Sequence, residues 1–168
     1  MSSKPTQKTR YEPSQTEISA LLSLFNQGRS DQVELLSRAM TVSYPRYGFG
    51  WQVLGVVLQL QGRVAEALLP MQKAAELMPG DADSHNNLGV TFHKLGQLYS
   101  SEESFLRALK LRPIYAEAHN NLGAVFFDQA RFSEAELCFR QALKLKPGYA
   151  EAQMNLGRLC AFMDRPDE

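Results

Sequence analysis

The 168-residue chain has no excess of either charge, because 18 lysines and arginines balance 18 aspartates and glutamates. Nucleic-acid-binding proteins usually carry a basic excess or stripe, so the balance argues against that class. No apolar run approaches the ~18–20 residues that a membrane-spanning helix needs. The N-terminal segment MSSKPTQKTRYEPS also lacks the apolar core of a signal peptide. We therefore expect a cytoplasmic protein with no nucleic-acid and no membrane partner.

Cysteine is scarce as well, because the chain holds only Cys138 and Cys160. Their spacing matches no metal site, and both lie in segments with a helical pattern. We expect two buried, reduced thiols in a cytosolic protein. The chain also lacks glycine-rich phosphate loops and any serine or cysteine in a nucleophile context. The sequence therefore predicts a protein that is not an enzyme and binds neither cofactor nor metal.

What the chain does contain is one phrase repeated with variations. Residues 82–113 read ADSHNNLGVTFHKLGQLYSSEESFLRALKLRP, and residues 116–147 read AEAHNNLGAVFFDQARFSEAELCFRQALKLKP. A Leu-Gly pair recurs every 34 residues, at Leu54-Gly55, Leu88-Gly89, Leu122-Gly123 and Leu156-Gly157. A proline recurs at the same interval, at Pro45, Pro79, Pro113 and Pro147. A fixed period of roughly 20–50 residues is typical of stacked repeats.

Each unit has the pattern of two helices joined by a turn. The first helix carries a bulky residue, a Leu-Gly pair three positions later and then a large apolar residue. The turn falls at a glycine such as Gly96, or without glycine at Ala130, where a left-handed residue would cost about 1 kcal/mol. The second helix carries small, large and small residues, as at Ala135, Phe139 and Ala142. It ends before a proline, which cannot continue a helix.

The glycines inside the first helices are unfavourable by themselves, since each costs about 1 kcal/mol relative to alanine. A cost that recurs at one place, as at Gly89 and Gly123, indicates a gain that recurs with it. We expect the second helix to approach the first closely at these points, with the alanines of the second helix as the matching small partners.

The histidines are the best candidates for metal or catalytic chemistry. His85 and His119 lie 34 residues apart, but they hold the bulky first position that Trp51 holds in the preceding copy. We therefore expect them to be packing residues. His93 has no cysteine or acidic ligand at a useful spacing from His85, so the histidines do not predict a metal site.

Both ends of the sequence depart from the repeated pattern. Residues 1–13 are polar and basic, and we expect them to form a disordered tail. Ser14 and Glu17 have the spacing of a capping box, and Gly28 marks the expected end of the helix that follows. We expect a repeat domain at 14–168, with a divergent repeat at 14–47, full repeats at 48–81, 82–115 and 116–149, and a partial repeat at 150–168.

The 34-residue period, the Trp51-x-x-Leu54-Gly55 opening and the closing prolines resemble the tetratricopeptide repeat family. The resemblance implies an all-α fold, a right-handed superhelical solenoid of antiparallel helix pairs. It also implies a non-catalytic scaffold that binds an extended peptide or a partner protein in its concave groove. The His-Asn-Asn-Leu-Gly sequence looks like the repeats that precede the catalytic domain of bacterial proteins similar to O-GlcNAc transferase. A pentatricopeptide array is the nearest rival, but its repeat has a different length and it binds RNA.

In the tetratricopeptide family the first helix of each unit lines the groove, and this implies the groove-facing positions here. They are Gln52, Val56, Gln59, Asn86, Val90, His93, Asn120, Ala124 and Phe127. Asn87, Asn121 and Asn155 form a further column, whose amides can grip a peptide backbone or bridge neighbouring helices; both roles stay open. The candidate binding residues are Asn87, Asn121, Asn155, Asn86, Asn120, Gln52, His93 and Phe127.

The expected last helix, Ala150–Met163, is more apolar than its inner neighbour can cover. Its apolar residues include Met154, Leu156, Leu159, Cys160 and Phe162. A terminal helix of a solenoid normally has a polar outer face. Two alternatives to a simple groove scaffold therefore stay open. The chain is the N-terminal, substrate-presenting module of a larger transferase, or it forms a homodimer through this helix.

Overall fold

The computed structural model of the protein describes residues 12–163. These residues form nine α-helices and no strand. The tail expected at residues 1–13 lies outside the described residues except for Glu12 and the buried Pro13, and residues 164–168 lie outside them too. The helices are α1 (Gln15–Asn26), α2 (Ser30–Ser43), α3 (Gly48–Leu60), α4 (Val64–Leu77), α5 (Ala82–Lys94), α6 (Leu98–Leu111), α7 (Ala116–Asp128), α8 (Phe132–Leu145) and α9 (Ala150–Met163).

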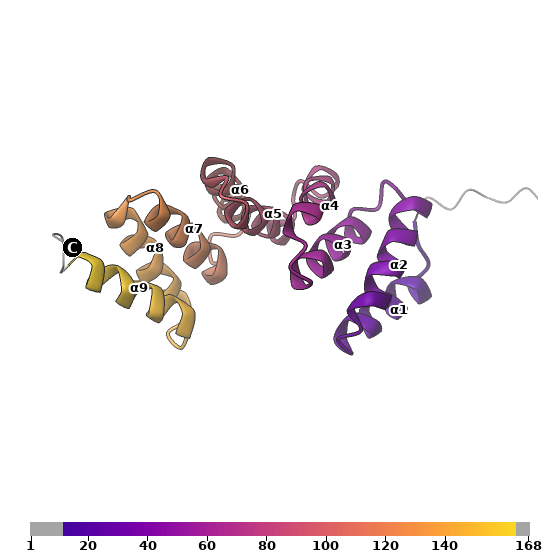
Figure 1. Ribbon diagram of the computed structural model, residues 1–168, viewed down its shortest axis with the longest axis horizontal. Helices are drawn as coiled ribbons and strands as arrows, with labels where there is room; N and C mark the ends of the chain where they lie inside the picture. Colours follow the sequence, from indigo (N-terminus) through magenta and orange to yellow (C-terminus); the bar gives the residue numbers. More distant parts are fainter. Residues whose placement is uncertain (1–11, 164–168) are drawn as a thin grey trace, which may run out of the picture.

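The helices stack as antiparallel pairs in a solenoid. Each odd-numbered helix from α1 to α7 packs against the helix that follows it, and each even-numbered helix packs against the next odd-numbered one. In Figure 1 the pairs follow one another along the long axis, with α4 and α6 at the top of the view and both ends lower. Among the described residues, helices contact only neighbours one or two places along the chain. The predicted fold class, an all-α solenoid of helix pairs, is confirmed.

Helix α1 begins and ends where its sequence predicts. Ser14 Oγ accepts a hydrogen bond from the Glu17 N–H at 3.2 Å, and Glu17 Oε2 accepts one from the Ser14 N–H at 2.7 Å. These reciprocal bonds are the expected capping box. Gly28 follows the end of the helix with a φ of +68°, the left-handed conformation that glycine adopts without strain.

The turns inside the later pairs use the same left-handed conformation. Gly62 and Gly96 have φ angles of +76° and +72°, and Ala130 takes the equivalent place at +59°. A Cβ atom in this region crowds the backbone and costs roughly 1–2 kcal/mol. The turn between α7 and α8 is therefore the strained one, as its missing glycine predicts.

Inside the complete pairs, one large side chain of the second helix lies against the mid-helix glycine of the first. A Cβ atom built on Gly123 would come within 2.7 Å of the Phe139 ring. Phe139 is buried in a close-packed core and has little room to turn aside. We call this contact the glycine notch. It recurs between Gly55 and Met71 and between Gly89 and Phe105.

The glycine notch confirms the close approach but corrects its partner. The sequence suggests that the alanines of the second helix face the glycines of the first. The structure instead places Phe139 against Gly123, while Ala135 and Ala142 are buried one turn before and one turn after Phe139. Each glycine therefore accommodates one large side chain of the second helix. The small alanines on either side of that side chain allow the second helix to pack closely against the first.

Gly157 on α9 is the exception. A Cβ atom built there would meet nothing within 4 Å, and Gly157 itself is exposed. The Leu-Gly pair is present, but no second helix covers it among the described residues. The glycine thus carries its helix-propensity cost without the packing that compensates for it in the other pairs.

In each unit, the side chain at the bulky first position forms a hydrogen bond with the main-chain carbonyl oxygen of the proline six residues earlier. The predicted packing residues His85 and His119 are therefore tied to the preceding loop. The nitrogen–oxygen distances are 2.9 Å from Trp51 Nε1 to Pro45, 3.1 Å from His85 Nε2 to Pro79, 3.0 Å from His119 Nε2 to Pro113 and 3.0 Å from Gln153 Nε2 to Pro147.

The two cysteines differ in exposure. Cys138 on α8 is partly buried, and this burial raises the pKa of its thiol to about 11. Cys160 on α9 is exposed, so the prediction of two buried thiols is wrong for Cys160. Its exposure has the same origin as that of Gly157, because no second helix covers this face of α9 in the described residues.

The glycine notch predicts opposite effects for one substitution at two equivalent positions. Gly123→Ala should lower the free energy of unfolding by about 1 kcal/mol, because overpacking costs about 1–3 kcal/mol and outweighs the gain in helix propensity. Gly157→Ala should raise it by about 1 kcal/mol, since only the propensity gain applies. Urea unfolding at low protein concentration measures both, and equal effects at the two sites would contradict the notch.

Candidate functional site

The first helices of the pairs form one continuous face of the solenoid. Helix α3 contacts α5, α5 contacts α7, and α7 contacts α9. We call this the first-helix face. Two hollows lie on it, one toward each end of the chain. The first, of about 240 Å3, is lined by Leu22, Phe25, Phe49, Gln52, Val53, Val56 and Asn87.

This apolar hollow joins α1, α3 and α5. Five of its seven lining side chains are apolar and none is charged. Leu22 is 42% exposed although it belongs to the apolar stripe of α1. Val56, which the family resemblance placed in the groove, is half-buried in the wall. An apolar group from solvent can therefore reach this hollow and be desolvated there.

The two amides of the apolar hollow differ in their hydrogen bonds. Gln52 Nε2 donates to Asp81 Oδ2 and to Ser84 Oγ, both at 3.1 Å, so the Gln52 side chain is held by the next helix pair. Asn87 is half-buried, and its side chain makes no hydrogen bond with any other described residue. The main-chain carbonyl oxygen of Asn87, by contrast, accepts hydrogen bonds from Gln59 Nε2 and Thr91 Oγ1. The Asn87 side-chain amide is therefore available to a partner.

The other predicted asparagines form rungs between neighbouring pairs. Asn121 Nδ2 donates to Asn86 Oδ1 at 3.2 Å, and Asn155 Nδ2 donates to Asn120 Oδ1 at 3.0 Å. Asn86 and Asn120 are buried, and Asn120 also bonds Glu151 at 3.2 Å. The expectation that Asn86 and Asn120 face the groove is thus corrected, because burial leaves their amides to bridge helices.

Asn87 makes no such bridge. In the register of the other rungs, Asn87 would bond Gln52. Asp81 caps α5 by accepting a bond from the Ser84 N–H at 2.9 Å, and Gln52 Nε2 donates to this cap, while no bond joins Gln52 to Asn87. The three asparagines of the predicted column are therefore not equivalent. Identical residues at identical spacing gave no sign of this difference.

The second hollow, of about 110 Å3, is lined by residues of α5, α7, α8 and α9, and its lining mixes polar and apolar side chains. His93 Nε2 lies 2.6 Å from Asp128 Oδ2, which ties α5 to α7. The guanidinium of Arg158 lies 5.5 Å from the centre of the Phe127 ring. His93 and Phe127 therefore line the same hollow, and the side chain of each already contacts a neighbouring residue. The lining residues are His93, Ala124, Phe127, Asp128, Phe139, Asn155 and Arg158.

Two other residues that the family resemblance placed in the groove instead contact the interior of the protein. Val90 is half-buried and packs against the hydrophobic cluster around Phe105 and Phe139. Gln59 is half-buried and bonds the backbone and side chain of α5. These positions help to join the pairs.

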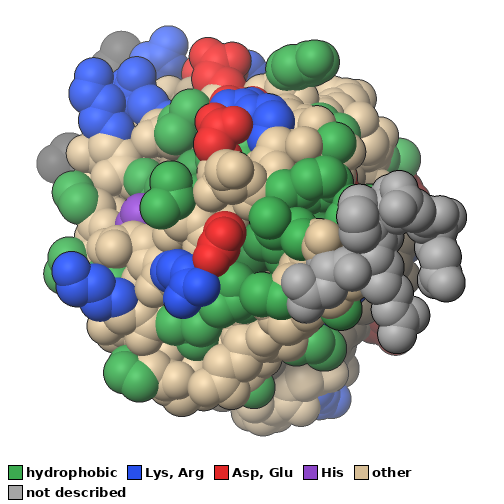
Figure 2. All heavy atoms as spheres, turned by 90° about the vertical axis from the view of Figure 1, so that its left-hand side faces the viewer, with side chains coloured by type: hydrophobic (Ala, Val, Ile, Leu, Met, Phe, Trp, Pro, Cys, Tyr) green, Lys and Arg blue, Asp and Glu red, His purple; other side chains and the backbone are tan. Residues whose placement is uncertain are grey.

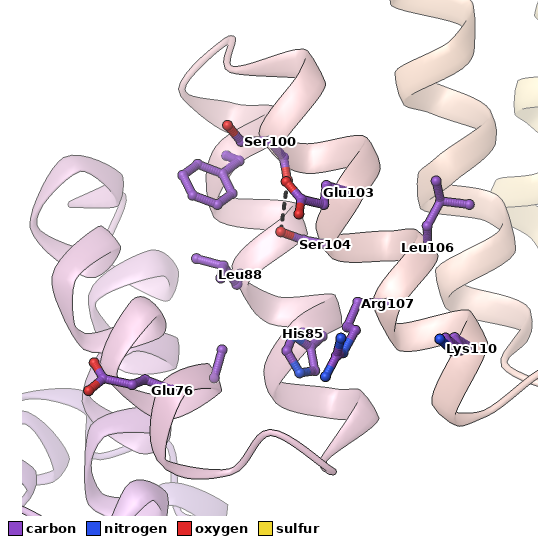
Figure 3. Close-up of a pocket in the computed structure, with 11 residues that line it drawn as sticks. Glu76, His85, Leu88, Ser100, Glu103, Ser104, Leu106, Arg107 and Lys110 are labelled. Atoms are coloured by element: carbon purple, nitrogen blue, oxygen red, sulfur yellow. Dashed lines mark hydrogen bonds between the residues drawn. The ribbon is translucent and has the colours of Figure 1, made fainter.

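A larger hollow, of about 610 Å3, lies away from the first-helix face, between α4, α5 and α6. Figure 3 shows Glu76, Glu103, Arg107 and Lys110 around its rim and Leu88 toward its floor. The rim mixes acidic and basic groups, so its charge selects no class of ligand. Sequence reasoning gave no sign of this hollow.

The helix junction at this larger hollow lacks an ion pair that both adjoining junctions have. Arg63 Nη1 lies 2.7 Å from Glu34 Oε2, and Arg131 Nη1 lies 2.7 Å from Glu102 Oε2. The equivalent residues at the junction between them are Leu68 and Gln97. Asp83 instead joins the two helices of the α5–α6 pair, since it accepts bonds from Arg112 at the end of α6 at 2.9 and 2.8 Å, and these bonds lower the pKa of the Asp83 carboxyl.

No group of histidine, cysteine, aspartate and glutamate side chains within residues 12–163 has the arrangement of a metal site. None of the helices in this range combines the length and the apolarity that crossing a bilayer requires. Neither finding adds a chemical function to the two hollows of the first-helix face.

Comparison with solved structures supports the fold. A MamA protein shares 18% identity with a TM-score of 0.79, covering 90% of this chain and 83% of that chain. YrrB, described as a TPR protein with an unusual peptide-binding site, shares 19% with a TM-score of 0.77, covering 96% and 81%. The first TPR of Spaghetti (RPAP3), bound to the HSP90 peptide SRMEEVD, shares 21% with a TM-score of 0.67, covering 70% and 93%. At these identities the likeness concerns the fold.

The sequence itself matches two models of the tetratricopeptide repeat, one at residues 82–115 and the other at residues 116–149. No curated protein matches the chain. The matches indicate no catalytic family, and the resemblance to the repeats of transferases stays a prediction. Residues 82–149 are tetratricopeptide repeats, and the described chain has the solenoid fold of tetratricopeptide-repeat proteins.

Proposed function

We propose that the chain is a non-catalytic scaffold that binds an extended peptide of a partner protein across the first-helix face. Tetratricopeptide-repeat proteins generally mediate protein–protein interactions, and the RPAP3 repeats are bound to a peptide. The observation that carries the proposal is the apolar hollow with the unpaired Asn87 amide in its wall. An apolar pocket next to a free amide suits a side chain and the backbone beside it.

The size and charge of the apolar hollow define the peptide. Its volume of about 240 Å3 is below the ~300–1,000 Å3 of sites for small molecules, and it suits one large apolar side chain. Burying such a side chain contributes about 1.5–3 kcal/mol. The Asn87 amide offers two donors and an acceptor to the peptide backbone. No lysine or arginine lines the hollow, so no cationic side chain there can pair with a terminal carboxylate.

The apolar hollow can be tested with peptides selected from a displayed random library. Val56→Asp should weaken the selected peptides at least tenfold, because about 1.4 kcal/mol of apolar burial is lost and tenfold corresponds to that energy. Leu35→Asp is the matched control, since Leu35 is 73% exposed on α2 and lines neither hollow. Fluorescence anisotropy measures both affinities. Peptides that bind the Val56→Asp protein as tightly as the parent would contradict this site.

Two asparagines separate binding from bridging. Asn87→Ala should reduce peptide affinity roughly two- to tenfold, the value of a hydrogen bond of about 0.5–1.5 kcal/mol, and leave stability unchanged. Asn120→Ala should lower the free energy of unfolding by about 1–3 kcal/mol, because it removes two hydrogen bonds of a buried side chain, and should leave the affinity of the folded protein unchanged. Binding titrations and urea unfolding test the pair. The reverse pattern would make Asn87 the structural residue.

We also propose that the protein self-associates through α9. Met154, Phe162 and Met163 are 60%, 53% and 47% exposed there. Figure 2, which views the α9 end of the molecule, shows apolar side chains gathered across its middle. A solenoid end normally carries a polar outer face, so this one suits an apolar partner.

Sedimentation velocity over increasing concentrations tests self-association. The mean mass should rise with concentration, and Met154→Glu should prevent the rise because it places a charge on the apolar face. Val42→Glu is the matched control, since Val42 is 81% exposed on α2. A protein that stays monomeric throughout would overturn the proposal.

A further inference from the structure

One face of α9 has the pattern of a helix interface but is uncovered. Ala150, Met154, Gly157 and Ala161 are spaced at i, i+4, i+7 and i+11, which places them on one face of the helix. All four are exposed. Their counterparts on α7, one repeat earlier, are covered by α8 and α9. Those counterparts are the buried Ala116, Asn120 and Gly123 and the half-buried Phe127.

Gly157 is an unfilled notch on this face. The three equivalent glycines each receive one long or flat apolar side chain, and a Cβ atom on any of them would lie within 3 Å of it. Nothing lies within 4 Å of the corresponding point at Gly157. The side chains that fill the other notches are Met71, Phe105 and Phe139.

Met154 is a protruding side chain of the type that fills such a notch. Its equivalents are amides that bond the following pair, so methionine breaks the series of polar rungs at α9. The spacing of Ala150, Met154 and Gly157 is also the spacing of Ala67, Met71 and Ala74 on α4. Met71 is the side chain that fills the notch at Gly55. The amides that Met154 replaces are Gln52, Asn86 and Asn120.

We propose that α9 packs against α9 of a second copy, antiparallel about a two-fold axis, with Met154 of each copy seated over Gly157 of the other. This inference rests on the proposed self-association and gives it a register. A helix that carries both the protruding side chain and the notch complements itself, and a two-fold interface satisfies both contacts at once. The same register places Ala150 against Ala161 of the second copy, so small residues flank the contact.

The charges of α9 favour the antiparallel orientation. In the antiparallel register, Arg158 lies opposite Gln153 of the second copy, while Glu151 lies opposite Cys160. A parallel pairing in register would place Arg158 against Arg158 and Glu151 against Glu151, and like charges in contact disfavour association. Both Glu151 and Arg158 are exposed.

The expected dimer is weak because the face is short. Helix α9 has 14 residues, which corresponds to about 21 Å. One helix pair of this length buries less than the ~1,200–2,000 Å2 of a stable interface. Association should therefore depend on concentration, as self-association through one helix requires.

Disulfide cross-linking reads the register directly. The background is Cys138→Ser with Cys160→Ser; Ser104 already occupies the position equivalent to Cys138 one repeat earlier. In this background, a mixture of the Ala150→Cys and Ala161→Cys proteins should cross-link. Each protein alone should not, because residues 150 of two antiparallel copies lie about 16 Å apart along the axis. A disulfide needs Cα atoms within about 7 Å.

The outcomes separate the register from the self-association. Cross-linking of the mixture alone, in a protein that sediments as a dimer, supports the proposal. Cross-linking of each protein alone indicates a parallel pair, and a dimer with no cross-link indicates another surface; either overturns the register while self-association stands. A monomer at every concentration overturns both. Gly157→Leu adds a control, since it should abolish the dimer without affecting the monomer's fold.

Discussion

The packing of one large side chain into one glycine notch is the contact on which the rest of the solenoid depends. Phe139 against Gly123 fixes how closely two helices of a pair approach, and the same contact is built in the two preceding pairs. Because the large side chain is fully buried, each pair has a single well-packed arrangement. The positions of the first-helix face follow from this spacing, since helices held at one distance present their remaining faces in one line.

The pairs are joined to each other by polar contacts that vary along the chain. Amide bridges such as that from Asn155 to Asn120 recur. An ion pair joins Arg63 to Glu34 and an equivalent one joins Arg131 to Glu102, but the junction between these two has no such ion pair. In a solenoid, stability is approximately a sum of such neighbour terms. Packing inside the pairs therefore keeps the repeat constant, and the junctions are where this chain differs from a uniform array.

The sequence predicts what depends on periodicity and misses what depends on competition for a partner. The helix pairs, the capping box at Ser14 and the strained turn at Ala130 are confirmed, because local pattern and backbone conformation determine them. The difference between Asn87 and the other asparagines could not be predicted, because it depends on which side-chain hydrogen bonds form between neighbouring pairs, and the repeat period does not determine these. The exposure of Cys160 depends on a covering helix that the described chain does not supply. The helical pattern of the sequence around Cys160 does not differ from that of the helices that are covered.

The two proposed surfaces lie apart and can act together. The apolar hollow draws its lining from α1, α3 and α5 only, so pairing through α9 covers none of it. A two-fold pair therefore carries two hollows on separate copies, both left open. A partner with two apolar segments would then gain avidity, because its second contact becomes intramolecular, provided that its linker spans the distance between the hollows. Weak contacts at each surface are in this way compatible with firm capture of a bivalent partner.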